Sequence, residues 1–422
     1  MNQNQELLQA VVLGDRSLLL QQLQDDSCSQ LVKNRALIHA SQIGNAEIVK
    51  LLLDYGAEID YQHPPHWISP LMVAAAKNHT DVVALLLLKG AEVNLTNDDG
   101  SPALAIATHQ GYLDIVKLLV NAGAKIDIRD RDGDTPIKLA IKNNQTEVLD
   151  YLLSQCPIAR SLEPEAETPL TLATDLNQKA IVEKLIQGGA DVNEATDAGE
   201  TPIAIAAANG YGELVSYFLS VGANPNLADV AGDTPLHIAT VEDYRDIVLD
   251  LLQHGAKPNL KNALGDTPLM IAALQDYPEI VELLFAHGAN PAIENNQETA
   301  LSLALGENNL EMVKTLLSLG VDPNTRDRKG RTILMEACDR GNVELMEILL
   351  AAGADINLQD DADATALMWA SHRGHEAAVK LLLSQPDINT QLRNHSGYTA
   401  ADLAEYNRYE SVEKLLLEHQ PK

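Results

Sequence analysis

The sequence has few aromatic residues, few cysteines and few basic residues, and each shortage narrows what the chain can be. Aromatic residues make up 4% of the 422 residues, while hydrophobic residues of all kinds make up 45%. The core must therefore consist of Leu, Ile, Val and Ala in thin layers, which favours stacked helices. The three cysteines, Cys28, Cys156 and Cys338, lack the Cys-x-x-Cys spacing of a zinc knuckle and indicate no disulfide framework, so a cytoplasmic compartment is expected.

Positive charge is scarce, because 30 basic residues stand against 60 acidic residues and give a formal charge of -30. Such a chain repels nucleic acids and anionic membrane surfaces, so neither is expected as a partner. Residues 151–300 hold 22 acidic and 6 basic side chains. This stretch is either a solvated surface or a surface that steers a basic partner.

Long apolar runs and catalytic motifs are also missing. The opening segment has no basic start and no uninterrupted apolar stretch, which predicts neither secretion nor membrane insertion. The sequence contains no GxSxG elbow, no GxxxxGK[ST] phosphate loop and no HExxH motif. We therefore expect no catalysis, no cofactor and no metal site.

The sequence does contain a repeat with a period near 33 residues. Its anchors are Gln5, Arg35, Ser69, Pro102, Thr135, Thr168, Thr201, Thr234, Thr267, Thr299, Thr332, Thr365 and Thr399. Alanine follows every anchor after five residues, as Ala239 follows Thr234. Positions below are counted from the anchor, so Ala239 is at position +5.

Each unit predicts two helices and a loop. Thr234-Pro235 caps and starts an inner helix, which should end near position +9, where Gly44, Gly210 and Gly374 stand. The apolar residues Ile247, Val248, Leu251 and Leu252 form one stripe of an outer helix. Gly then recurs at position +21, where a helix end favours positive φ, and an extended loop with a β-turn tip follows.

This unit resembles the ankyrin repeat, for which a 33-residue period with the pattern T-P-L-H-x-A is typical. The best copies are DVAGDTPLHIA, Asp229 to Ala239, and DIVLDLLQHGA, Asp246 to Ala256. The resemblance implies an all-α solenoid of stacked helix-turn-helix units. It also implies one continuous array over residues 1–422, with capping repeats at 1–34 and 394–422. Local irregularity is expected at residues 156–167 and at Pro386.

The resemblance further implies a partner-binding concave face, formed by the turn tips and the exposed side of the inner helices. The tips vary in charge along the chain, from acidic through mixed (Ala263, Leu264, Asp266) to basic. The acidic candidates are Asp98, Asp99, Asp132, Asp134, Asp197 and Glu200. A surface graded in this way would select its partner by charge.

The basic candidates are Arg326, Arg328, Lys329 and Arg331 on one tip, with Arg340 and Arg373 at position +8 of two successive repeats. Two interpretations remain open. Asp360, Asp361 and Asp363 on the next tip could neutralise them, or the arginines could bind carboxylates of a partner.

Other conspicuous residues have structural interpretations. Trp369 occupies a position where other repeats carry Ile, which predicts a core residue. The pairs His63/His66 and His372/His375 and the tyrosines at position +10 are expected to belong to the framework. Trp67 lies in a lengthened tip, where it either packs on the neighbouring tip or anchors a partner.

The sequence thus predicts a monomeric, non-catalytic protein-binding scaffold. A targeting or inhibitory subunit of an enzyme complex is one alternative. A bacterial effector exported into a host cell and an enzyme with an unrecognised site are two others.

Overall fold

The computed structural model describes residues 3–24, 28–155, 167–296 and 298–419. Over these residues the chain forms 26 helices, and its only strand-like pairings are four isolated β-bridges. The predicted all-α class is confirmed. Within the same ranges, no helix combines the length and apolarity that a bilayer crossing requires.

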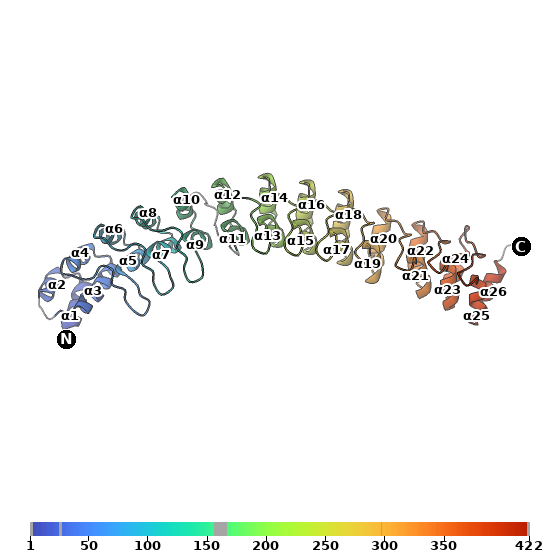
Figure 1. Ribbon diagram of the computed structural model, residues 1–422, viewed down its shortest axis with the longest axis horizontal. Helices are drawn as coiled ribbons and strands as arrows, with labels where there is room; N and C mark the ends of the chain where they lie inside the picture. The colour runs from blue at the N-terminus through green and yellow to red at the C-terminus, as the bar shows by residue number, and fades with distance from the viewer. Residues whose placement is uncertain (1–2, 25–27, 156–166, 297, 420–422) are drawn as a thin grey trace. The chain divides into compact units, whose positions relative to one another are not determined.

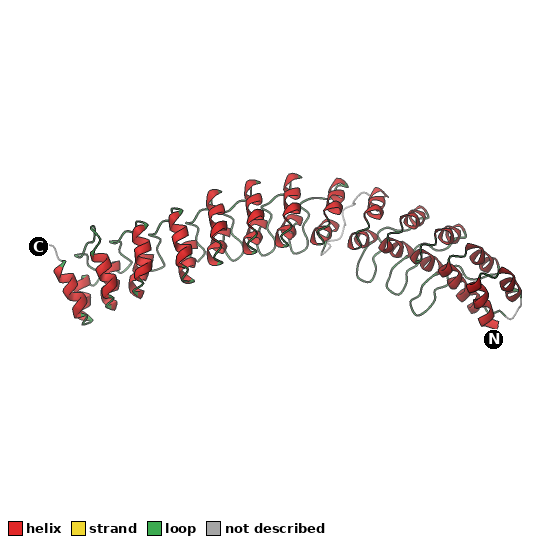
Figure 2. Cartoon of the chain, turned by 180° about the vertical axis from the view of Figure 1, so that it is seen from behind, coloured by secondary structure: helices red, strands yellow, loops and turns green. Residues whose placement is uncertain are grey.

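The chain forms two compact units, Met1–Pro202 and Ile203–Lys422. In each unit the inner helices form one row and the outer helices form a second row (Figures 1 and 2). Whether the two units continue one array, with caps at 1–34 and 394–422, stays a prediction.

The first unit alternates inner and outer helices. Its inner helices are α1 (Gln3–Leu13), α3 (Gln30–Ile43), α5 (Pro70–Ala76), α7 (Ala103–Gln110), α9 (Pro136–Lys142) and α11 (Pro169–Asp175). Its outer helices are α2 (Arg16–Leu23), α4 (Ala46–Asp54), α6 (Thr80–Leu88), α8 (Leu113–Asn121), α10 (Thr146–Gln155) and α12 (Lys179–Gln187).

The second unit has the same alternation. Its inner helices are α13 (Pro202–Ala208, which begins at the last residue of the first unit), α15 (Pro235–Val241), α17 (Pro268–Leu274), α19 (Ala300–Gly306), α21 (Ile333–Arg340), α23 (Ala366–Arg373) and α25 (Ala400–Tyr406). Its outer helices are α14 (Gly212–Ser220), α16 (Arg245–Gln253), α18 (Pro278–Ala286), α20 (Leu310–Ser318), α22 (Val343–Ala351), α24 (Glu376–Leu383) and α26 (Glu410–Glu418).

The inner helices begin as the Thr-Pro pattern predicts. The Thr234 hydroxyl accepts a hydrogen bond from the backbone N–H of His237, and Pro235 is the first helical residue. The His237 ring returns the contact, since its Nδ1 lies 2.8 Å from the Thr234 hydroxyl. These contacts satisfy backbone groups at the start of α15 that would otherwise lack partners.

The alanines at position +5 lie where the inner helices stack. Ala239 and Ala272 have no exposed surface, and their helices α15 and α17 pack on each other. The outer-helix stripe is also confirmed, because Ile247, Val248 and Leu251 are buried. A methyl group is the largest side chain that lets helices approach this closely, which explains the repeated alanine.

The inner helices end in a left-handed residue at position +9, as predicted for Gly44 and Gly374, whose φ values are 85° and 75°. Where glycine is missing, Asn144 and Asp243 adopt the same conformation, with φ of 53° and 56°. Asn and Asp tolerate positive φ better than other side chains do. The helix end is therefore conserved in shape even where the glycine is absent.

One of the two predicted irregularities spans residues 156–167, and residues 156–166 of this segment lie outside the described residues. The other, at Pro386, shortens an outer helix: α24 ends at Leu383 and has 8 residues, whereas α22 has 9.

Candidate functional site

Many of the turn tips are held in shape by an Asp or Asn at position -5. On the tip before Thr332, Asp327 Oδ1 accepts the backbone N–H groups of Lys329 and Arg331 at 2.8 and 2.9 Å. Burial alone raises the pKa of Asp327. These two hydrogen bonds and the Arg331 guanidinium outweigh burial and hold the pKa below its usual value. The tip is thus a fixed platform for side chains.

Other tips repeat this arrangement, and neighbouring tips are joined by backbone hydrogen bonds. Asn262 Oδ1 accepts the N–H groups of Leu264 and Asp266, both at 3.0 Å. The N–H of Ala263 donates to the carbonyl of Ala231 on the preceding tip at 2.8 Å. A partner therefore meets linked tips instead of separate flexible loops.

The tip residues and the end of the inner helix share one side of a repeat. In the repeat anchored at Thr135, Lys142 at position +7 binds Asp134 at position -1, and its Nζ lies 2.8 and 2.6 Å from the two carboxylate oxygens. This hydrogen bond is the main reason that the pKa of Lys142 lies above its usual value. We call this side, which carries positions -1, +4, +7 and +8, the inner-helix face.

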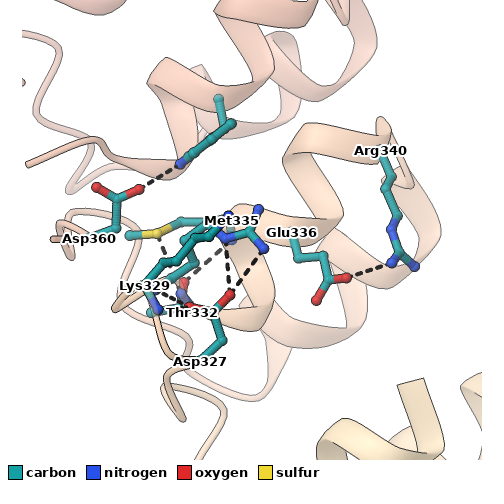
Figure 3. Close-up of polar contacts among 9 residues, drawn as sticks. Asp327, Lys329, Thr332, Met335, Glu336, Arg340 and Asp360 are labelled. Atoms are coloured by element: carbon teal, nitrogen blue, oxygen red, sulfur yellow. Dashed lines mark hydrogen bonds and ion pairs between the residues drawn. The ribbon is translucent and has the colours of Figure 1, made fainter. Parts of the chain in front are cut away.

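Three of the predicted partner-binding arginines form ion pairs within the chain. Arg331 Nη2 lies 3.0 Å from Asp327 Oδ2. Arg340 pairs with Glu336 one helical turn earlier, with 2.6 Å between Nη2 and Oε1 (Figure 3). Arg373 Nε lies 2.6 Å from Oδ1 of Asp339 in the preceding repeat.

The neutralising carboxylates are not the ones that the sequence suggested. Asp360 accepts a hydrogen bond from Trp369 Nε1 at 3.0 Å, Asp361 donates its backbone N–H to the carbonyl of Lys329, and Asp363 lies 3.6 Å from His395 Nδ1. Arg331, Arg340 and Arg373 pair instead with Asp327, Glu336 and Asp339, because helix geometry and the turn bring these carboxylates within reach.

The remaining basic residues of this tip differ in how much they are engaged. Arg326 Nη1 donates to the carbonyl of Gln359 at 2.9 Å, and Arg328 Nη2 donates to the carbonyl of Asn296 at 3.1 Å. The Lys329 side chain is exposed and has no ion pair in the described part of the chain. Arg328 and Lys329 thus keep their charges free of a carboxylate partner.

Trp369 is half-buried, so its prediction as a core residue was wrong. Its ring lies under the Arg331 guanidinium, with 5.6 Å from Cζ to the ring centroid, and its indole N–H reaches Asp360. Position +4 faces outward along the inner helices, since Ile238 and Ile271 are half-buried too. The aliphatic pattern at this position marks a partly covered surface.

Trp67 lies on a tip of the first unit with 54% of its surface exposed. Its φ of 52° is left-handed, and glycine occupies the equivalent position, -2, on the next two tips, at Gly100 and Gly133. A bulky residue in this conformation is strained. The exposure disfavours the interpretation that Trp67 mainly packs on the neighbouring tip.

The acidic candidates all lie in the first unit and differ in exposure. Asp98 is half-buried, with Oδ2 3.1 Å from His66 Nδ1, and Asp134 is buried beside Lys142. The exposed carboxylates are Asp99, Asp132, Asp197 and Glu200. Asp99 has only a distant cation, since Arg131 Nη1 lies 3.8 Å away.

The framework interpretation of the histidines at the ends of the inner helices matches their contacts. His375 Nε2 lies 3.1 Å from the carbonyl oxygen of Asp339, and His79 makes the same contact with Gln42 at 2.9 Å. Tyr244, the N-cap residue of α16, occupies the equivalent position. Among the described residues, His, Cys, Asp and Glu side chains form no group of three or more that could hold a metal ion.

Sequence reasoning missed a ladder of asparagines between repeats. Asn259 Oδ1 accepts the backbone N–H of Asn290 at 2.7 Å, and its Nδ2 donates to the carbonyl of Gly288 at 3.0 Å. Asn226 makes the same pair of contacts one repeat earlier. The recurrence of Asn at position -8, also at Asn94, Asn324 and Asn357, was the available signal.

Stacked two-helix repeats with linked turn tips define this protein as a helical repeat solenoid. A family model described as ankyrin repeats (3 copies) matches residues 7–97, 71–163, 104–196, 170–262, 251–327, 269–360 and 334–422. The chain belongs to the ankyrin repeat family.

Curated proteins show similarity over short stretches. Protein phosphatase 1 regulatory subunit 27 of Homo sapiens is 42% identical over 65 residues, which are 15% of this chain and 42% of that protein. Mitochondrial disaggregase of Homo sapiens is 46% identical over 69 residues, 16% of this chain and 10% of that protein. Ankyrin repeat and SAM domain-containing protein 6 of Danio rerio is 39% identical over 77 residues, which are 18% of this chain and 10% of that protein. The chain therefore spans less than half the length of each of these relatives.

Proposed function

We propose that this protein is a non-catalytic scaffold that binds a partner protein through its turn tips and inner-helix face. One contrast carries the proposal. Position +5 is a buried alanine in repeat after repeat, whereas position +7 holds Lys142, Asp175, Val241, Asp339 or His372. Packing fixes the first position and leaves the second free to select a partner.

In the second unit, the contacts that we propose centre on Arg328 and Lys329, exposed cations of the tip that have no carboxylate partner among the described residues. Arg326, Arg331, Arg340 and Arg373 belong to the same surface. Arg326 donates to the carbonyl of Gln359, whereas Arg331, Arg340 and Arg373 can each exchange a carboxylate of this chain for one of the partner. An acidic segment is the complementary ligand for this tip.

In the first unit we propose contacts at the exposed acidic tips and at Trp67. An exposed indole can contribute a large apolar contact area to an interface. Replacing Trp67 by Gly gives the backbone the residue that Gly100 and Gly133 provide on the next tips. We expect W67G to leave the urea unfolding midpoint nearly unchanged and to weaken partner binding about tenfold or more, equivalent to about 1.4 kcal/mol. Unchanged binding would remove Trp67 from the interface.

The direct test is affinity capture from source cells with the full chain, read by quantitative mass spectrometry. One variant combines Arg328→Glu and Lys329→Glu on the tip. A matched control combines Lys314→Glu and Lys380→Glu on the outer helices α20 and α24, with the same change in charge. We expect the tip variant to lose its partner and the control to keep it. Loss from the control alone would place the interface on the outer helices and overturn the proposal.

A targeting or inhibitory subunit is the second candidate function, favoured by the similarity to a protein named as a phosphatase regulatory subunit. The two candidates differ in what the chain does to its captured partner. A regulatory subunit changes the turnover rate or substrate choice of a partner enzyme, whereas a scaffold leaves both unchanged. Turnover by the purified chain alone would contradict both candidates.

A further inference from the structure

Two neighbouring repeats of the second unit expose large aliphatic side chains. Val230 and Leu264 lie on successive tips with 78% and 76% of their surfaces exposed, and Val241 and Leu274 lie at position +7 of α15 and α17 with 45% and 43% exposed. We call these four residues the apolar stripe. Six other repeats carry a polar residue at position +7, three carry only Ala or Gly there, and the terminal repeats carry Val12 and Tyr406, so Val241 and Leu274 are the pair of successive large aliphatic residues at this position.

The apolar stripe is continuous because its two repeats are joined. Helices α15 and α17 pack side by side, and Ala263 donates its backbone N–H to Ala231 of the preceding tip. Ile238 and Ile271, half-buried at position +4, lie one helical turn before Val241 and Leu274 and extend the apolar surface along both helices.

Within the described ranges, the carboxylates beside the apolar stripe form no ion pair. Asp233 and Asp266 occupy position -1, which neighbours position +7 in the repeat where Lys142 binds Asp134. Asp233 Oδ1 accepts a hydrogen bond from Asn262 Nδ2 at 2.9 Å, and Asp266 Oδ1 accepts one from Asn295 Nδ2 at 2.7 Å.

Basic side chains are scarce throughout this region. Residues 201–300 contain three, Arg245, Lys257 and Lys261. Arg245 is already paired, because its guanidinium lies 3.2 Å from Glu279 and 3.4 Å from Asp243. Lys261 donates to the carbonyl of Glu294 at 2.7 Å. Val241 and Leu274 thus occupy the position that Lys142 has in its own repeat, while the acidic residue at position -1 is present in all three repeats.

We propose that the apolar stripe binds a basic segment of a partner protein, whose aliphatic side chains cover Val241 and Leu274 and whose Lys or Arg side chains bind Asp233 and Asp266. The partner thereby supplies in trans the cation that Lys142 supplies within the chain. This inference rests on the proposed function, since it names the partner chemistry of the same inner-helix face.

The spacing of the repeats sets the spacing of the cations. Packed helices lie about 8 to 10 Å apart, and one three-residue turn of a polyproline II segment, which returns the side chain to the same face, spans about 9 Å. A segment with a cation at every third residue and aliphatic residues between them therefore matches both carboxylates at once. A second copy of this acidic chain is the competing occupant, and like charge disfavours it.

The test uses the full chain and a dye-labelled peptide, acetyl-Lys-Leu-Ala-Lys-Leu-Ala-Lys-amide, followed by fluorescence anisotropy. One variant combines Val241→Ser and Leu274→Ser, and a second combines Asp233→Asn and Asp266→Asn. The matched control combines Val221→Ser and Asp246→Asn, which change an exposed aliphatic residue and an exposed carboxylate at the outer helices. We expect each stripe variant to weaken binding about tenfold or more, with circular dichroism unchanged, and the control to bind like the wild type.

Two further results separate the outcomes. A peptide with Ser in place of Leu should bind weakly to the wild type and to every variant. If the original peptide binds the wild type and both stripe variants with equal affinity, the inference is overturned. Sedimentation that shows a dimer lost in the Val241→Ser/Leu274→Ser variant also overturns it in favour of a second copy. If the captured partner depends on Lys329 but not on the apolar stripe, the inference fails and the proposed function stands.

Discussion

Replacing Ala239 by Phe tests whether the array is held together by close approach of its inner helices. Ala239 has no exposed surface, and its carbonyl accepts the Tyr244 N–H at 3.0 Å. Leu236 before it and Val248 on the outer helix of the same repeat are also completely buried. A phenyl ring at this position therefore has no space unless a helix moves.

Overpacking of a closed site lowers the free energy of unfolding by about 1 to 3 kcal/mol. Because Ala239 has no exposed surface, we expect the Phe variant to lie near the upper end of this range. Because each repeat contacts only its neighbours, the loss should concentrate in the adjacent layers. Ser is a graded comparison. Its hydroxyl can donate to the carbonyl of Pro235, as Thr240 Oγ1 donates to Leu236 at 2.7 Å, so we expect a cost below about 1 kcal/mol.

Hydrogen exchange read by mass spectrometry over residues 201–300 measures this effect directly. Gln253→Phe is the control, because it places the same ring on the exposed side of α16. The Phe variant at 239 should exchange faster in α15 and α17, while the Ser variant and the control stay close to the wild type. Unchanged protection in A239F would refute the role given to this alanine.

Three further predictions concern the tips, the ladder and pH. Asp327→Ala should lower the free energy of unfolding by about 1 to 2 kcal/mol, because two backbone hydrogen bonds are lost. Asp327→Asn keeps the acceptor oxygen and should lower it by less than about half of that amount. Urea unfolding measures both changes. Asn259→Ala should likewise lower stability by about 1 to 2 kcal/mol, and equal stability would exclude the ladder as a source of cohesion. Hydrogen bonds from Thr399 lower the pKa of Asp402 in the folded state. The ionised carboxylate therefore stabilises the fold above the pKa of the unfolded state, and this stabilisation is lost as the pH falls through the pKa of the folded state. The drop in urea midpoint from pH 5 to pH 3 should therefore be smaller in Asp402→Asn than in the wild type.

Local rules made most of the fold predictable. The Thr234 cap and the terminating Gly374 act within a few residues of themselves, so sequence spacing sufficed. The Asn259 ladder could not be derived in the same way, because it joins residues 31 apart whose alignment exists only after stacking.

The candidate site was less predictable for a related reason. Arg340 has several carboxylates nearby in sequence, and helix periodicity selected Glu336 over the acidic tip that follows. Trp369 occupies an aliphatic position that is only half-covered, so its hydrophobicity alone suggested burial. The mixed tip containing Leu264 gained significance only beside Val230 of the previous repeat, since neither residue makes a surface alone.

Hydrogen exchange of the full chain, alone and with its captured partner, tests the central claim most directly. The account predicts slowed exchange at turn tips such as 229–233, 262–266 and 327–331, with the outer helices unchanged. Slowed exchange confined to outer helices such as α16, α18 and α20, with the tips unchanged, would contradict recognition through the inner-helix face.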